Sequence, residues 1–384
     1  MGVVAEAVPA AVHIRNREVD KMDFQEIMNQ FQIEGKVTEV SALGQGTVNH
    51  TYQVICGQVS YVLQEINHVL FKYPIEVMNN LFLVTEYLRE KIESDGGNPD
   101  RETLTFIRTK DENQLLQTQE GSYFRLYKMV EDGLEMERPE TAEEAYQAAA
   151  VLGKFQHRMV GFDAALLSYT FPQMHQFKTA IRHLLDAVRA DICSRTSDCQ
   201  EQIRFVLNRS EKLYKIEEAV ANGQIPKRVT HNDPGYDNVL IDEVTKEAIC
   251  MIDLDTLMPG ASIYDFGAAV RIGAASEPEY VTDGDVYLDL EKYRAYLEGY
   301  LSYMGTHLNE QEKDLLGYSV WVMTMEKGIH YLTEYLSGDR NITDFSNEKQ
   351  NLFCAVNQFF LVLDMEEKEE EMSQILKEVR MNTI

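Results

Sequence analysis

The sequence is poor in basic residues. Its 384 residues include 36 Lys and Arg against 63 Asp and Glu, and the formal net charge at pH 7 is −27. Proteins that bind nucleic acids draw much of their affinity from Lys and Arg side chains that neutralise phosphates, and these residues form no evident cluster along this chain. We therefore expect no nucleic-acid partner.

Cysteine and long apolar runs are scarce as well. The five cysteines are scattered and lack C-x-x-C spacing, so we expect free thiols in a cytoplasmic protein and no structural metal. No stretch reaches the roughly 18 consecutive apolar residues of a membrane helix, and residues 1–20 lack a basic segment before their short apolar run. We expect a protein that is neither exported nor bound to a membrane.

The hydrophobic pattern of the first part of the chain indicates a sheet with one long helix. Residues 1–21 show no clear period, and we expect them to form a non-essential tail. After them, alternation of apolar with polar residues predicts strands, and one run has helical spacing. We predict an N-terminal unit over 22–131, with three strands within 37–65, a helix over about 74–92 and strands at 104–108 and 122–130.

The second part, residues 132–384, is predicted to be mostly helical. Thr141 and Glu144 have the spacing of a capping box ahead of a periodic apolar run. A strand-rich island at 228–252 interrupts the helices. The whole chain is therefore predicted to be α+β, and the helices of this second unit are expected at 141–161, about 174–220, 288–303, 309–336 and 348–380.

The strand-rich island contains the residues that indicate chemistry. His231, Asp233 and Asn238 follow the pattern H-x-D-x-x-x-x-N, which has the spacing of a kinase catalytic loop. In such a loop the Asp accepts the proton of the substrate hydroxyl, the Asn reaches Mg²⁺, and the His is structural. The competing interpretation is an ordinary turn, because Asn, Asp, Pro and Gly all favour turns.

A second carboxylate is expected to complete the metal site. Asp253 follows the apolar run 249–252 and ends the hairpin that begins at Asn238, so it is the predicted metal ligand, with Asp255 assisting or structural. The triplet that begins at Asp265 spells the D-F-G motif, but it lies beyond Pro259. We expect Asp265 to cap the next helix instead.

A glycine-containing loop lies upstream, between two predicted strands. Gly44 and Gly46 would let backbone amides approach a triphosphate, and Thr47 and Asn49 are further candidates for contact with ATP. The loop lacks a third glycine, so taken alone it is equally consistent with a plain hairpin turn. Its position ahead of the catalytic loop favours the nucleotide role.

These motifs together resemble the aminoglycoside phosphotransferase and choline kinase superfamily. The likeness extends through GQGTVNHTYQV, YVLQEIN, LGKFQHRMVGFDAALL and HYLTEYLSGD, and within the superfamily it is most similar to the bacterial N-acetylhexosamine 1-kinases. It implies a two-lobed protein-kinase-like fold, ATP between the lobes, Mg²⁺, and phosphate transfer to a small-molecule hydroxyl. It assigns the catalytic base to Asp233 and the metal ligands to Asn238 and Asp253.

The chain departs from this family at one important position. Family members usually carry a Lys or Arg on the third strand, where this chain has Gln64, so the phosphate-pairing cation is missing or moved. Glu76 and Glu86 are both candidates for the helix glutamate that would pair with it. Basic residues expected near the sugar are also absent, because Cys354 and Val356 stand in their place.

The resemblance implies a sugar 1-kinase acting on the anomeric hydroxyl of an N-acetylhexosamine. Aromatic residues could line a sugar pocket, although each one alone is better explained by core packing. Two alternatives remain: another acceptor, such as choline, homoserine or an aminoglycoside, or a catalytically inactive nucleotide-binding module. The oligomeric state is not predicted, and the candidate substrate contacts are Asp255, Tyr236, His330, Tyr331 and Tyr335.

Overall fold

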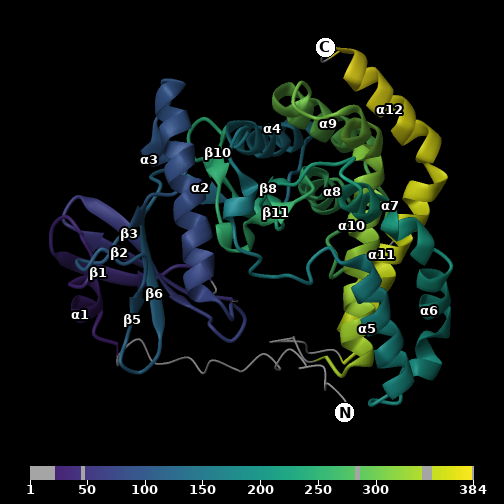
Figure 1. The fold of residues 1–384 in the computed structure, drawn as a ribbon, viewed down its shortest axis with the longest axis horizontal. Helices are drawn as coiled ribbons and strands as arrows, with labels where there is room; N and C mark the ends of the chain where they lie inside the picture. Colours follow the sequence, from purple (N-terminus) through teal and green to yellow (C-terminus); the bar gives the residue numbers. More distant parts are fainter. Residues whose placement is uncertain (1–21, 45–47, 282–285, 340–347, 383–384) are drawn as a thin grey trace.

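The computed structural model describes residues 22–44, 48–281, 286–339 and 348–382, and the predicted tail at 1–21 lies outside the described residues. An antiparallel sheet with one long helix forms one end of the molecule, and packed helices form the other (Figure 1). The prediction of an α+β, two-lobed fold is confirmed. We call residues 22–131 the N-lobe and residues 132–382 the C-lobe.

The N-lobe sheet has the strand order β1-β2-β3-β6-β4, and β5 also pairs with β6. One face packs its apolar residues, among them Tyr52, Leu63 and Phe124, against helix α1 (Phe24–Met28). The strand pattern places alternate residues on that face, because successive side chains of a strand point to opposite sides. The strands are β1 (Val37–Ala42), β2 (His50–Cys56), β3 (Val59–Ile66), β4 (Phe106–Ile107), β5 (Leu116–Gln117) and β6 (Tyr123–Lys128).

Helix α2 (Pro74–Ser94) connects the sheet to the C-lobe, and the short helix α3 (Pro99–Glu102) follows it. The buried face of α2 belongs to the same apolar core as the C-lobe helices. Asn80, which is 2% exposed, donates hydrogen bonds to the carbonyl oxygens of Ser168 (2.8 Å) and Leu257 (2.9 Å). The lobes are therefore joined by a packed and hydrogen-bonded helix as well as by the chain itself.

The C-lobe helices begin and end close to the predicted positions, with two differences. The stretch predicted at 174–220 is three helices, and the stretch at 348–380 is two. Within the described ranges, none of these helices has both the length and the apolar character of a membrane span. They are α4 (Ala142–Arg158), α5 (Phe177–Ala190), α6 (Gln200–Leu207), α7 (Ser210–Ala221), α8 (Ser262–Gly273), α9 (Leu290–Met304), α10 (Glu310–Leu336), α11 (Gln350–Glu367) and α12 (Glu369–Asn382).

Two small sheets lie between the N-lobe and these helices and form the strand-rich island. One has the order β10-β9-β7 and the other pairs β11 with β8, all antiparallel. Strand β7, which follows the polar segment after Glu131, was not predicted. The strands are β7 (Gly133–Glu135), β8 (Arg228–Thr230), β9 (Val239–Asp242), β10 (Ala248–Met251) and β11 (Met258–Gly260).

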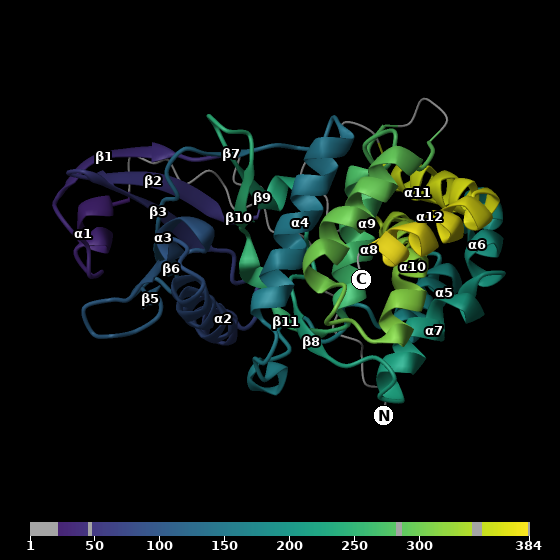
Figure 2. The ribbon, with the colours of Figure 1, turned by 90° about the horizontal axis from the view of Figure 1, so that it is seen from above.

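Glycines allow the central helices to approach one another closely. Figure 2 shows α4 beside α9, and α8 close to α10. A Cβ atom on Gly299 of α9 would lie 2.3 Å from the carbonyl oxygen of Tyr146 on α4. A Cβ atom on Gly267 of α8 would lie 2.5 Å from the carbonyl oxygen of Ser319 on α10. These contacts bring α8, which carries Asp265, against the centre of the C-lobe.

We predict that Gly267→Ala destabilises the protein. The added methyl group would collide with backbone, which cannot rotate away, and overpacking of this kind costs about 1–3 kcal/mol. Urea unfolding followed by circular dichroism measures the loss. Gly317→Ala on α10 is the control, because its Cβ would meet the hydroxyl end of the Tyr293 side chain, and its loss should be smaller. Equal stability of Gly267→Ala and the parent would contradict the close-packing argument.

Candidate active site

The predicted catalytic loop joins β8 to β9 at the edge of the island. Asp233 is exposed, whereas His231 is fully buried and Asn238 is 8% exposed. Asn232 lies in the left-handed region, at φ 68°. Asn adopts that conformation more readily than most residues, and such backbone strain is concentrated at functional sites. The loop therefore turns sharply so that Asp233 faces outward and its neighbours face the core.

The carboxylate of Asp265 binds the backbone of this loop from the buried side. Its carboxylate accepts the backbone N–H groups of His231 (2.8 Å) and Asn232 (2.7 Å), and also the side-chain N–H of Gln156 (2.8 Å). The prediction that Asp265 caps the next helix is wrong: α8 begins at Ser262, so Asp265 already lies in its first turn. From that position it caps the catalytic loop, because the side chain points away from the helix toward two loop amides that lack other partners.

The other two residues of the D-F-G triplet are packed in the core. Phe266 is fully buried and contacts Tyr300, with 5.1 Å between ring centroids. Gly267 makes the close approach to α10 described above. All three residues of the triplet therefore have structural contacts, and the carboxylate oxygens of Asp265 are already occupied by hydrogen bonds.

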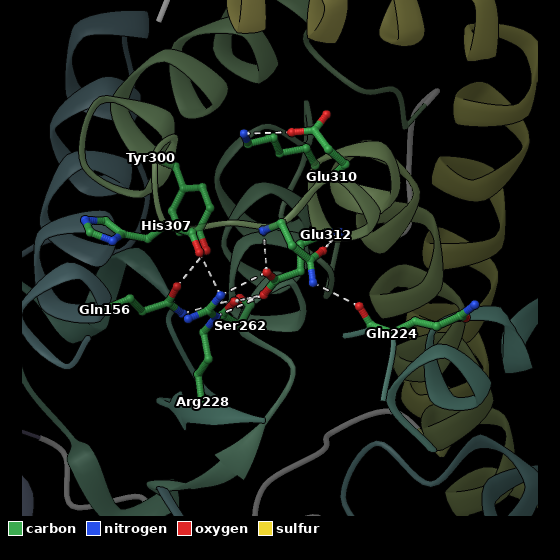
Figure 3. A network of polar contacts seen from close by, with 10 residues as sticks. Gln156, Gln224, Arg228, Ser262, Tyr300, His307, Glu310 and Glu312 are labelled. Carbon is green, nitrogen blue, oxygen red and sulfur yellow. Dashed lines mark hydrogen bonds and ion pairs between the residues drawn. The ribbon is translucent and has the colours of Figure 1, made fainter. Parts of the chain in front are cut away.

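A polar network extends from Asp265 into the C-lobe through Gln156. Figure 3 shows how it continues from Gln156 to Tyr300, and the neighbouring group of Arg228, Ser262 and Glu312. The hydroxyl of Tyr300 donates to Gln156 Oε1 (2.6 Å), and Gln156 in turn holds Asp265. On the other side, Arg228 binds both carboxylate oxygens of Glu312, at 3.0 and 2.9 Å. Ser262 Oγ also donates to Glu312 (3.3 Å). Because buried polar groups are costly unless satisfied, this network specifies one arrangement of the helices around the loop.

His231 links the catalytic loop to the segment that carries Asp253. Its Nε2 atom lies 2.9 Å from the carbonyl oxygen of Ile252, and the N–H of Asp233 donates to its Nδ1 atom (3.3 Å). These partners require a neutral ring with its proton on Nε2, because Nδ1 acts as an acceptor. A ring in that form serves as a spacer between the two segments and has no free nitrogen for proton transfer.

Asn238 and Asp253 offer oxygen ligands that suit Mg²⁺. The Nδ2 group of Asn238 donates to the carbonyl oxygen of Asp233 (2.8 Å), which leaves Oδ1 as the ligand atom. Asp253 is exposed and has φ 52°, in the left-handed region. Mg²⁺ is commonly held by one or two protein oxygens together with substrate phosphates and water. In the described part of the chain no three His, Cys, Asp or Glu residues are placed to hold a metal.

The carboxylate of Asp253 lies in an acidic environment. Desolvation by the surrounding protein, followed by the negative charge of Asp255, raises the pKa of Asp253 to about 7, and Arg125 opposes this rise. The side chain nevertheless remains open to solvent on one side. A divalent cation would compete with the proton for this carboxylate, so the same electrostatics favour a cation at this position.

Only part of the predicted nucleotide loop can be described. Gly44 has φ +69°, a conformation that suits glycine, while Gly46 and Thr47 lie outside the described residues. Asn49 is 6% exposed, and its side chain donates to Asp255 Oδ2 (3.0 Å) and accepts the N–H of Asn67 (3.0 Å). Asn49 therefore anchors the C-terminal end of the loop.

A buried arginine lies on the strand next to the third strand. Gln64 on β3 stands directly opposite Arg125 on β6, and Arg125 Nε donates to Gln64 Oε1 (2.8 Å). The guanidinium also binds both carboxylate oxygens of Asp255, with Nη2 to Oδ2 at 2.9 Å. Neither candidate helix glutamate supplies this partner: Glu86 pairs with Arg108 (2.8 Å). Sequence reasoning missed Arg125, although an Arg between two apolar residues of a strand was an available signal.

Three of the five predicted substrate residues are buried, and the other two are not. Tyr236 and Tyr335 are 3% and 2% exposed and pack in the core. Asp255 is also 3% exposed, with its carboxylate bound by Arg125 and Asn49, so it faces the protein interior. The Tyr331 hydroxyl donates to Glu279, and His330 is exposed on α10.

We predict that Asp265 and Asp253 can be separated by mutation. Asp265→Ala leaves two buried loop amides without acceptors, at about 1–3 kcal/mol for each unsatisfied group. It should lower the unfolding midpoint and also reduce activity by releasing the loop. Asp253→Ala should not lower the unfolding midpoint, and it should lose Mg²⁺-dependent ADP binding, measured by calorimetry. The reverse result would make Asp265 the metal carboxylate.

We also predict that Asp253→Asn stabilises the metal-free protein above neutral pH. The pKa of the folded carboxyl is about 7, against 3.8 for an ordinary Asp, so the folded state binds the proton more tightly than the unfolded state. The resulting stabilisation is present at low pH and is lost as pH rises from about 4 to 7. Thermal melts in EDTA should show a gain for Asp253→Asn that grows through this window and then levels off. A gain in thermal stability that does not change with pH would contradict a raised pKa of Asp253 in the folded state.

Comparison with known proteins gives a family model for the middle of the chain and similar folds for most of it. The model of the family described as "Phosphotransferase enzyme family" matches residues 111–299, a stretch that contains the catalytic loop, Asp253 and α8. The match leaves out β1 to β3 and the last three helices. Those elements are instead covered by likeness to solved structures.

Three similar solved structures span nearly the whole chain. A microcompartment-associated aminopropanol kinase is 15% identical with a TM-score of 0.57, over 92% of this chain and 98% of that chain. Spectinomycin phosphotransferase in complex with ADP and spectinomycin is 14% identical with a TM-score of 0.53, over 92% and 97%. Plasmodium vivax ethanolamine kinase is 12% identical with a TM-score of 0.52, over 88% and 85%. At these identities the likeness shows the kinase-like fold, and residues 111–299 match the model of the phosphotransferase enzyme family.

Proposed function

We propose that the protein is a small-molecule kinase that transfers the γ-phosphoryl group of ATP to a hydroxyl group of its acceptor. The observation that carries this proposal is the catalytic loop: Asp233 is exposed on a strained turn that Asp265 holds by two amides, with Asn238 and Asp253 on the adjoining segments. A base, an amide oxygen and a second carboxylate in this order are the parts that phosphoryl transfer requires.

Each residue of the site has its own role in the proposed phosphoryl transfer. Asp233 orients the acceptor hydroxyl and takes its proton while the hydroxyl oxygen bonds to the γ-phosphorus and the bond to the bridging oxygen of ADP breaks. Asn238 and Asp253 would hold Mg²⁺, which neutralises charge on the phosphates when it is bound. The loop between β1 and β2, which includes Gly44, would cover the phosphates with backbone amides. Asp265 and His231 hold these groups at fixed positions relative to one another.

The first candidate acceptor is the anomeric hydroxyl of an N-acetylhexosamine. It is supported by the sequence resemblance, and exposed His330 and the neighbouring Tyr331 on α10 are the substrate candidates consistent with it.

The alternative to catalysis, an inactive nucleotide-binding module, is disfavoured because a protein released from catalysis has no chemical reason to keep Asp233, Asn238 and Asp253 together.

The second candidate acceptor is an amino alcohol or an aminoglycoside. Asp233 and Asp237 are both exposed on the same loop, and desolvation together with the charge of Asp233 raises the pKa of Asp237. Concentrated negative charge attracts a cationic acceptor. Similar folds carry the names aminopropanol kinase, ethanolamine kinase and spectinomycin phosphotransferase, whose named acceptors all contain amino groups.

We predict that Asp233→Asn abolishes turnover while ATP affinity stays within a few-fold of the parent, because the base acts in the transition state and not chiefly on the nucleotide. ADP release is measured across N-acetylhexosamines, amino alcohols and aminoglycosides, with product identity checked by phosphorus NMR. Asp237→Asn is the matched control on the same loop: because Asp237 is not the base, the variant should keep kcat within tenfold at saturating acceptor, even where it raises the KM of a cationic acceptor. Turnover by Asp233→Asn within tenfold of the parent would contradict the assignment of the base.

A further inference from the structure

The two lobes meet at a buried cluster of polar side chains that the proposed mechanism does not use. Its centre is Asp255, which comes from the C-lobe two positions after the proposed metal ligand Asp253. Three side chains of the N-lobe belong to the cluster: Arg125 and Asn49 bind Asp255, and Gln64 binds Arg125. Arg125 and Asp255 are each 3% exposed.

The cluster connects the two segments that would hold the nucleotide. Asn49 stands at the end of the loop between β1 and β2, and its Nδ2 group lies 3.0 Å from Asp255 Oδ2. The same carboxylate belongs to the segment that carries Asp253. One carboxylate therefore fixes Asn49, at the end of the loop, relative to the segment that carries the proposed metal ligand, across more than 200 residues of sequence.

The orientation of Arg125 is determined on every side. Asp255 binds the end of the guanidinium through two nitrogens, and Gln64 accepts from Nε at 2.8 Å. Gln64 in turn donates to Thr51 Oγ1 (3.0 Å), on the strand that follows the loop. Side chains directly opposite on paired strands share one face of a sheet. Arg125 therefore occupies the side of the sheet where a cation on the third strand would lie.

Such a buried pair is poorly explained by stability alone. Removing two charges from water is expensive, and buried ion pairs can often be replaced by neutral groups with little loss of stability. What a bidentate Arg–carboxylate pair supplies is geometry, because its two parallel hydrogen bonds fix the distance and the angle between the groups. The location of the pair between the lobes makes that geometry relevant to the nucleotide.

We propose that Arg125 and Asp255 form an inter-lobe clamp that positions the phosphate loop and Asp253 for the triphosphate, and that this clamp replaces the cation missing from the third strand. The inference rests on the proposed function. Arg125 and Asp255 are positioning residues in it, and Asp255 is not a contact for the acceptor. Gln64 belongs to the clamp as the residue that orients Nε of Arg125.

The test compares neutral and transposed versions of the clamp. Arg125→Gln combined with Asp255→Asn removes both charges and avoids leaving one unpaired. Gln64→Arg combined with Arg125→Gln moves the guanidinium back to the third strand, opposite its original position. The matched control is Arg209→Gln with Glu366→Gln, a bidentate pair at 2.9 and 2.6 Å that joins the turn between α6 and α7 to α11 in the C-lobe. Calorimetry with Mg·ADP and steady-state kinetics with each substrate varied are performed on all four proteins, together with thermal melts.

The neutral double variant should raise the Kd for Mg·ADP and the KM for ATP at least tenfold, with the acceptor KM within twofold. The transposed variant should recover nucleotide affinity to within about threefold, and the control pair should leave it unchanged. A folded neutral variant with parental nucleotide affinity would overturn the clamp, as would a transposed variant no better than the neutral one. If the neutral variant fails to fold, the transposed variant is compared with the parent: nucleotide affinity within about threefold supports the clamp, and a larger loss overturns it. A parent that binds no nucleotide would instead overturn the proposed function, and the clamp with it.

Discussion

The active geometry of this protein depends on one buried carboxylate and two backbone amides. Asp265 is fully buried, and it accepts the N–H groups of His231 and Asn232, the two residues that precede Asp233. These bonds, together with those from the Asn232 side chain to the carbonyl oxygens of Thr230 and Thr256, compensate the cost of the strained turn at Asn232, since the left-handed conformation is retained only where surrounding contacts determine it. The network through Gln156 and Tyr300 and the close packing of α8 on α10 then hold Asp265 itself.

The lobes are joined by contacts of two kinds, with different physical consequences. Helix α2 packs its apolar face into the C-lobe core, which contributes stability in proportion to the area removed from water. The cluster around Asp255 buries charge, which contributes little net stability but specifies distance and angle. The first contact keeps the lobes together, and the second fixes Asn49 relative to the segment that carries Asp253.

Sequence reasoning succeeded where the signal is local. The N-lobe strands other than β5 and the capping box of Thr141 and Glu144 are formed as predicted, because they depend on neighbours within a few residues. It failed where the signal is distant. The helical stretch at 174–220 is broken into three helices, and Asp265 was expected to cap its own helix. Its actual partners lie more than 30 residues away in sequence, and no periodicity reports them.

The sequence by itself determined the kinase-like class and the order of candidate groups, since the spacing of Asp233, Asn238 and Asp253 is a property of one short loop and one hairpin. Only the tertiary structure decided which charges meet. Gln64 and Arg125 lie on strands separated by a long helix, and they become neighbours through the antiparallel register of β3 with β6. Asp255 reaches them from the other lobe. Electrostatic partners depend on distance in space, and for residues so far apart in the chain that distance exists only once both lobes have folded and packed.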